Sequence, residues 1–323
     1  MINIHGHGQG HGQGLKNLMC LFTICLAKII PLYINILLGY LGGKLLNINR
    51  DSIARLMFYM INPLVIFNGI IHTKLESDVI TLPFITFSIG VVLCISFYWL
   101  SRRIWSDSTS NLIAYSAGTG NAGYFGLPLA LVFFDEEGEG IYIMALLGLI
   151  FYENTVGMYM FSLKKQSVKE SILLFLTLPS LYALMGGLIY NLLRLPPDIF
   201  NEFMVHIKGA YAVLGMMIIG LGLSGLSNFK IDYKFIGVTF LAKFVMWPLI
   251  AVSLVFIDNH FFHLFTHSIY NALLLISMVP MAVNTVILAS LMNIQQERPA
   301  AAVLLGTTLA IIYVPFMAEY LMF

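Results

Sequence analysis

Long apolar runs with almost no charged residues recur along the whole chain, and they limit its possible folds more than any other feature. A helix needs about 20 such residues to cross roughly 30 Å of hydrocarbon. Of the 323 residues, 59% are hydrophobic and only 10% are charged, whereas about a quarter of the residues in a soluble domain carry charge. The chain is therefore predicted to be an all-α, polytopic integral membrane protein.

The apolar runs predict ten transmembrane helices joined by connections too short to hold a soluble domain. These spans lie near residues 18–46, 53–72, 81–101, 110–134, 140–163, 171–193, 208–227, 235–257, 268–292 and 299–322. Lys and Arg are concentrated in the odd-numbered loops, for example at Arg102 and Arg103 in the third loop. The positive-inside rule places these loops in the cytoplasm and both termini outside, in a plasma or inner membrane.

The first 17 residues are predicted to form a flexible tail, because their Gly/His/Gln-rich composition cannot build a core. The alternative is a weak metal site at His5, His7 and His11. No other metal site, cofactor or nucleic-acid partner is expected. The scattered cysteines lack CxxC spacing and are interpreted as small buried hydrophobic residues: Cys20, Cys25 and Cys94.

The first and sixth spans share a pattern that indicates an internal repeat. A proline is followed eight residues later by a glycine in both, at Pro31 and Gly39 and again at Pro179 and Gly187. A repeat of five spans is odd-numbered, so the second copy must be inverted in the membrane. We therefore expect repeats over 18–163 and 171–323, joined by a short cytoplasmic linker at 164–170. The alternative is a chance match of common apolar residues.

The fourth and ninth spans carry helix breakers where a span should be regular. Asn121 lies among Gly120, Gly123 and Gly126, and Pro280 in the ninth span precedes Asn284 by about one turn. Backbone groups freed at membrane depth are tolerated only where protein or a water-filled cavity satisfies them. Two such breaks predict a substrate site, at which Asn121 and Asn284 either bind substrate or only satisfy the broken backbone.

Two ionisable residues lie deep in the predicted spans, where a charge is costly unless it is paired or hydrated. Glu153 is near the middle of the fifth span, with Asn154 beside it, and Lys243 lies within the eighth. Glu153 and Asn154 are candidates for ion or proton coupling, and Lys243 for balancing an anionic substrate. The alternatives are that Glu153 and Lys243 pair with each other, or that Lys243 extends to the cytoplasmic surface.

Several motifs resemble the auxin efflux carrier family, which includes plant PIN-type carriers and prokaryotic malonate or malate permeases. They are INPLVIFNGI (61–70), GNAGYFGLPL (120–129), VPMAVNTVILA (279–289) and ERPAAAVLLGTTLAIIYVPF (297–316). The resemblance implies a fold akin to sodium/bile-acid symporters, in which helices four and nine unwind and cross beside the substrate. It also implies a scaffold of helices 1, 2, 6 and 7 that forms a homodimer, and a transport domain of helices 3–5 and 8–10.

Carried over residue by residue, the resemblance matches Asn121 to the asparagine of the first crossover and Pro280 to the proline of the second. Gly120 stands where plant carriers have proline, and glycine can also break a helix. The expected substrate-binding residues are Asn121, Gly120, Pro280, Asn284 and Lys243.

The sequence thus predicts a secondary transporter that moves a small organic anion, most simply a carboxylate, by alternating access. One alternative is a sodium-coupled symporter of another anion, and a second is a non-transporting receptor on the same fold. An enzyme is disfavoured because Glu153 has no second carboxylate in its span and the chain lacks HExxH and Gly-x-Ser-x-Gly motifs.

Overall fold

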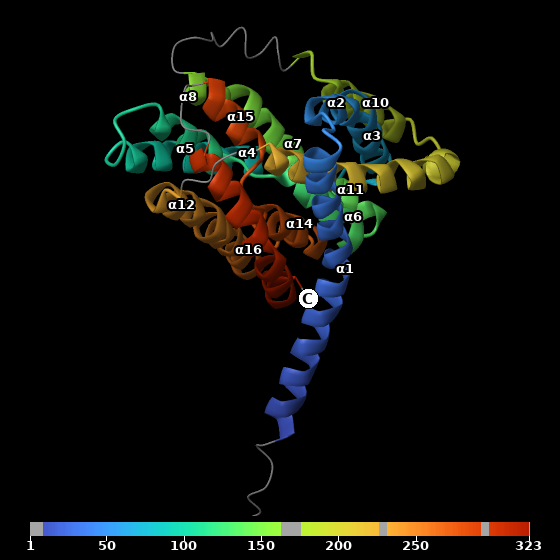
Figure 1. The fold of residues 1–323 in the computed structure, drawn as a ribbon. Helices are drawn as coiled ribbons and strands as arrows, with labels where there is room; N and C mark the ends of the chain where they lie inside the picture. Colours follow the sequence, from blue (N-terminus) through green and yellow to red (C-terminus); the bar gives the residue numbers. More distant parts are fainter. Residues whose placement is uncertain (1–8, 163–175, 226–230, 292–296, 323) are drawn as a thin grey trace, which may run out of the picture.

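The computed structural model describes residues 9–162, 176–225, 231–291 and 297–322, and all regular structure in them is helical (Figure 1). The first half contains α1 (Gln9–Leu45), α2 (Arg50–Leu56), η1 (Met57–Ile61), α3 (Asn62–His72), α4 (Ser77–Ser101), α5 (Thr109–Gly118), η2 (Ala122–Gly126), α6 (Leu127–Phe133), α7 (Glu136–Tyr152), η3 (Glu153–Gly157) and α8 (Met158–Ser162). The second half contains α10 (Pro179–Leu192), η4 (Pro197–Phe200), α11 (Asn201–Ser224), α12 (Tyr233–Phe240), η5 (Leu241–Met246), α13 (Trp247–Ile257), η6 (Asp258–Phe262), α14 (His267–Ser277), α15 (Asn284–Leu291) and α16 (Glu297–Leu321).

Seven continuous helical segments among the described residues are long and apolar enough to cross a membrane. They are Leu26–Leu45, Arg50–His72, Ser77–Ser101, Glu136–Phe161, Pro197–Ser224, Tyr233–Phe262 and Glu297–Leu321. The predicted class, an all-helical multi-pass membrane protein, is confirmed. The predicted linker at 164–170 lies outside the described residues, as do residues 1–8 of the predicted tail, and α1 begins at Gln9.

The remaining predicted spans, near residues 110–134, 171–193 and 268–292, correspond to shorter helices. α5 ends at Gly118, and regular structure resumes at Ala122. α14 ends at Ser277, and α15 begins at Asn284. We call residues 119–121 the first break and residues 278–283 the second break.

Small residues allow α1 and α11 to pack closely. A Cβ atom built on Gly39 of α1 would overlap the backbone of Met217, and one built on Gly220 of α11 would overlap the backbone of Ile36 and Tyr40. Helices in a membrane associate through such close backbone contact, because lipid offers no hydrophobic gain for bringing them together. Glycine is therefore required on both sides of this contact.

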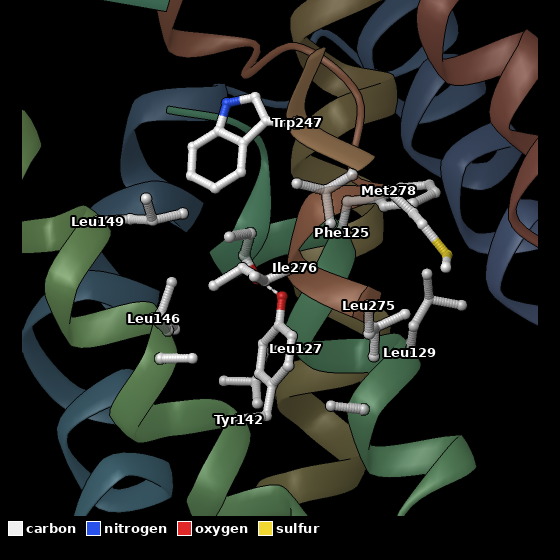
Figure 2. Packing of buried hydrophobic residues seen from close by; sticks show 14 of the residues in the cluster. Phe125, Leu127, Leu129, Tyr142, Leu146, Leu149, Trp247, Leu275, Ile276 and Met278 are labelled. Carbon is white, nitrogen blue, oxygen red and sulfur yellow. Dashed lines mark hydrogen bonds between the residues drawn. The ribbon is translucent and has the colours of Figure 1, made fainter. Parts of the chain in front are cut away.

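An apolar cluster lies against both breaks and fixes their surroundings (Figure 2). Phe125 and Leu127, just after the first break, pack with Tyr142 and Leu146 of α7 and with Met278 of the second break. All five side chains are buried. The breaks are thus set in a close-packed interior, where each backbone polar group needs a partner.

Candidate functional site

The two breaks meet through the backbone. The N–H of Asn121 donates to the carbonyl of Pro280 over 2.8 Å, joining residues far apart in the sequence. The carbonyl of Asn121 accepts the N–H groups of Phe125 and Gly126, each at 3.0 Å, which starts the following π-helical turn. The residue types that weaken the two spans therefore lie together at one place.

Gly120 is needed for the approach of the second break and of Lys243. A Cβ atom built on Gly120 would lie 2.7 Å from Cγ2 of Val279 and 2.8 Å from Nζ of Lys243. Both separations are shorter than a normal contact, so a larger residue would displace one of these groups. Glycine here supplies space, a role that breaking the helix alone does not require.

Side chains from other helices satisfy the carbonyls at the end of α5. Tyr152 donates its hydroxyl to the carbonyls of Tyr115 and Ala114 at 3.1 and 3.3 Å. The indole N–H of Trp247 donates to the carbonyl of Ala117 over 2.8 Å. These bonds replace the intrahelical partners that a C-terminal turn lacks, so the helix can end inside the protein.

Thr119 connects the two deep ionisable residues. Its hydroxyl donates to Oε1 of Glu153, and its carbonyl accepts a hydrogen bond from Nζ of Lys243. Lys243 also lies 4.9 Å from the centre of the Trp247 ring, a cation–π contact. The direct Glu153–Lys243 ion pair considered above does not occur between these two described residues.

Lys243 is 2% exposed, so it does not extend to the surface. Its ammonium group lies at the carbonyl end of α5, where the helix dipole favours a cation.

Three of the candidate residues lie in or directly before a π-helical turn. Asn121 precedes η2, Glu153 begins η3 and Lys243 lies in η5. A π-helical turn adds a residue to one helical turn and so frees a backbone group, and such turns are frequent at functional sites.

A cavity of about 140 Å³ lies beside the first break, and we call it the crossover cavity. Its lining includes Gly120, Asn121, Glu153, Asn154 and Asn284. Nδ2 of Asn121 is buried and has no hydrogen-bond partner in the described structure. An amide donor in this state costs about 1–3 kcal/mol, and the residue that carries it lines the cavity.

Asn62 of α3, which the sequence did not single out as a ligand, also lines the crossover cavity. Its Nδ2 donates to Oγ of Ser180 over 3.2 Å, and its Oδ1 is buried without a partner. Two asparagines of the cavity lining thus carry one buried unpaired acceptor and one buried unpaired donor. Asn62 could have been noticed in INPLVIFNGI, as a polar residue directly before a proline within a span.

The other predicted site residues hold different positions. Nδ2 of Asn154 donates to the carbonyl of Ile150, four residues earlier in the same continuous helical segment, at 2.8 Å. Oδ1 of Asn284 accepts from Arg50 at 2.7 Å. Pro280 contributes its carbonyl to Asn121, whereas Lys243 is not among the residues that line the crossover cavity.

The sequence matches the profile of a family described as membrane transport proteins over residues 24–318, which is most of the chain and includes both breaks. The chain belongs to this family, the auxin efflux carriers. The resemblance identified from the motifs is thereby confirmed.

Two archaeal relatives of this auxin efflux carrier family member align over nearly their full length. An uncharacterized transporter of Methanothermobacter thermautotrophicus is 22% identical over 302 residues, which cover 91% of this chain and 97% of the relative. An uncharacterized transporter of Methanocaldococcus jannaschii is 25% identical over 307 residues, covering 88% of this chain and 95% of the relative. Membership of a transporter family implies membrane transport rather than enzymatic catalysis.

Proposed function

We propose that this protein is a secondary transporter for a small organic anion and works by alternating access. One observation carries the proposal: Asn121, whose Nδ2 is buried and unpaired, lines a cavity where two broken helices meet. Secondary transporters bind substrate near the membrane midplane at such interrupted helices. The substrate class rests on family resemblance together with this donor.

Helix packing supports the proposed inverted repeat of five plus five spans. If spans one and two correspond to spans six and seven, the α1–α11 contact should have a counterpart between α10 and α3, and both pairs pack extensively. The repeat-related glycines lie in these contacts. Gly39 faces Met217 of α11, and a Cβ atom on Gly187 would lie 2.9 Å from Cβ of Ile70 in α3. In this arrangement the two breaks are the crossing points of spans four and nine.

The same packing supports the proposed division into scaffold and transport domain. α1 packs on α11, and α3 packs on both α10 and α11. α4 packs on α5 and α7, and α14 packs on α7. Contacts of α3 with α7 and of α1 with α16 join the two groups. In our proposal the first group is the scaffold, through which the protein forms a homodimer, and the second belongs to the domain that moves. The odd loops face the cytoplasm and both termini lie outside.

The volume and lining of the crossover cavity favour a small carboxylate carried together with a proton. Its 140 Å³ is below the roughly 300–1,000 Å³ of pockets for drug-sized ligands, which disfavours a bile acid. Glu153 lines the same cavity, so an anion bound there would be repelled by an ionised Glu153 and tolerated by a protonated one. Lys243, held by Thr119, supplies positive charge behind the first break.

The test is ligand-dependent thermal stabilisation of the purified protein by malonate, malate, indole-3-acetate and a bile acid, with and without sodium. Malonate or malate should raise the unfolding temperature of wild type and of the exposed-site control Asn259→Ala, but not that of Asn121→Ala. Loss of one hydrogen bond to a charged ligand weakens binding by about 1.5–3 kcal/mol, or roughly 10- to 150-fold.

The remaining outcomes separate the rival functions. A strict sodium requirement would favour the sodium-coupled symporter. Binding without flux in proteoliposomes would favour the receptor. Unchanged binding by Asn121→Ala would show that the side chain of this asparagine does not bind the substrate.

A further inference from the structure

Arg50, the first residue of α2, extends its guanidinium group to the second break. Its Nη2 donates to Oδ1 of Asn284, the first residue of α15, over 2.7 Å. Its Nε is buried and has no hydrogen-bond partner in the described structure. Arg50 therefore has one donor on a neutral amide and another that is unused.

A second cavity, of about 260 Å³, lies around this guanidinium group, and we call it the vestibule. It shares Phe58, Tyr124 and Asn284 with the crossover cavity, so the two spaces adjoin. The charged residues of its lining are Arg50, Arg55 and Asp51, which leaves a net positive charge. Between an anion in the vestibule and Asn121 lie the side chains that line both cavities.

The positive-inside bias accounts for an arginine in this loop, but it does not account for the direction in which the guanidinium group of Arg50 points. An arginine that serves only topology extends its head toward water. Arg50 is only partly exposed and directs its head to the exposed amide of Asn284, and it does so from the N-terminal end of α2, where the helix dipole disfavours a cation. A planar guanidinium group with unused donors is the side chain best suited to bind a carboxylate through two parallel hydrogen bonds.

We propose that Arg50 is the docking residue for the anionic substrate at the vestibule. The carboxylate takes the place of Oδ1 of Asn284 on the guanidinium group and then passes Phe58 and Tyr124 into the crossover cavity. Asn284, released from Arg50, becomes free to contact the same anion. This inference rests on the proposed function, because it assumes that an organic anion is the substrate.

The experiment measures malonate binding to the purified, detergent-solubilised protein by calorimetry at low and high ionic strength. The variants are Arg50→Gln, Arg50→Lys and Asn121→Ala, with Arg103→Gln as the matched control. Arg103 is an exposed arginine in another predicted cytoplasmic loop and lies outside both cavity linings. Arg50→Gln should raise the malonate Kd roughly 10- to 100-fold, as expected for losing hydrogen bonds from a charged donor.

Two further readouts separate docking from a purely structural role. Arg50→Lys keeps the charge but loses the forked geometry, so its Kd should fall between those of wild type and Arg50→Gln. The salt dependence of binding should weaken in Arg50→Gln and persist in Arg103→Gln, which a structural defect would not produce. If Arg50→Gln does not fold, the malonate Kd of Arg50→Lys is the deciding measurement. A Kd equal to that of wild type in Arg50→Lys overturns the proposal.

The outcomes also distinguish this inference from the proposed function. If wild type binds malonate and Asn121→Ala weakens binding while Arg50→Gln does not, Arg50 is not the docking residue and the proposed function stands. If wild type binds none of malonate, malate and indole-3-acetate, the anion proposal and the docking proposal are both overturned.

Discussion

Glu153 combines a titratable group with a position at the helix breaks. Its Oε1 accepts a hydrogen bond from the hydroxyl of Thr119, and the residue lines the crossover cavity. Glu153→Gln keeps a hydrogen-bond acceptor but cannot exchange a proton, so we expect a pH gradient no longer to drive malonate accumulation in proteoliposomes. Exchange of malonate down its own gradient should persist. Glu319→Gln, which changes another buried carboxyl group, is the control and should retain the response to pH. Wild-type accumulation by Glu153→Gln would exclude Glu153 as the proton carrier.

Gly120 is predicted to tolerate no side chain, because Val279 and Lys243 occupy the space that a Cβ atom would need. Gly120→Ala should destabilise the protein by about 1–3 kcal/mol, the usual result of overpacking a close-packed interior. Gly237→Ala is the matched control, since a Cβ atom there meets nothing within 4 Å. Comparison of thermal unfolding in one detergent measures both changes, and equal unfolding temperatures would contradict the close approach seen here.

Sequence reasoning identified the break residues but not their partners. Gly120, Asn121 and Pro280 stand out because helix breakers are conspicuous in an apolar run. The roles of Tyr152 and Trp247 in capping α5 could not be predicted, because an aromatic residue in a span has the same pattern whether it faces lipid or donates to a distant carbonyl. The long-range contact, rather than the residue type, determines those roles.

The proposed role of Arg50 could not be predicted from the sequence for a related reason. The positive-inside rule already explains a basic residue in this short loop, so the sequence gives no reason to assign Arg50 a further role. Only the fold shows that the loop lies beside α15, so that the guanidinium group reaches Asn284.

At the scale of elements, the α1–α11 contact is the part of the proposed scaffold that depends most on small residues. Gly220→Val would bring a branched side chain against the backbone of Ile36 and Tyr40 and force the two helices apart. We expect a loss of stability of about 1–3 kcal/mol or more, measured by thermal unfolding. Gly209→Ala on the same helix is the control, because a Cβ atom there meets nothing within 4 Å, and it should be neutral or slightly stabilising. Equal losses of stability in Gly220→Val and Gly209→Ala would show that the loss comes from replacing any glycine of α11 and not from the contact with α1.

Hydropathy located the long helices because each is a continuous apolar run, as in Ser77–Ser101. It could not locate the π-helical turns η3 and η5, because they arise from a shift in backbone hydrogen bonding within an unchanged apolar pattern. The side chains at these turns, Glu153 and Lys243, were nevertheless conspicuous as charges in spans. Their polarity could thus be used for prediction, whereas the local backbone geometry could not.

At the scale of the whole molecule, an ion-pair network joins the two proposed domains away from the vestibule. Lys208 of α11 lies 2.6 Å from Glu139 and 3.8 Å from Glu136, both on α7. Nε2 of His72 of α3 lies 3.4 Å from the same Glu136, a contact that is an ion pair only when the imidazole is protonated. In our proposal α3 and α11 belong to the scaffold and α7 to the moving domain. The network would therefore hold the end of the molecule opposite Arg50 closed in this conformation, and it would have to separate when that end opens.

Covalent closure of this network should stop transport without removing the substrate site. Lys208→Cys combined with Glu139→Cys, in a background where Cys20, Cys25 and Cys94 are replaced by serine, places two thiols where the ion pair now lies. A short bis-maleimide should then abolish malonate flux in proteoliposomes while malonate binding to the purified protein persists. The Lys208→Cys single variant, treated identically, controls for modification of one thiol, and the untreated double variant controls for the lost charges. Flux through the cross-linked protein equal to that of the single variant would mean that α7 does not move away from α11 during transport, and alternating access by these two groups of helices would be wrong.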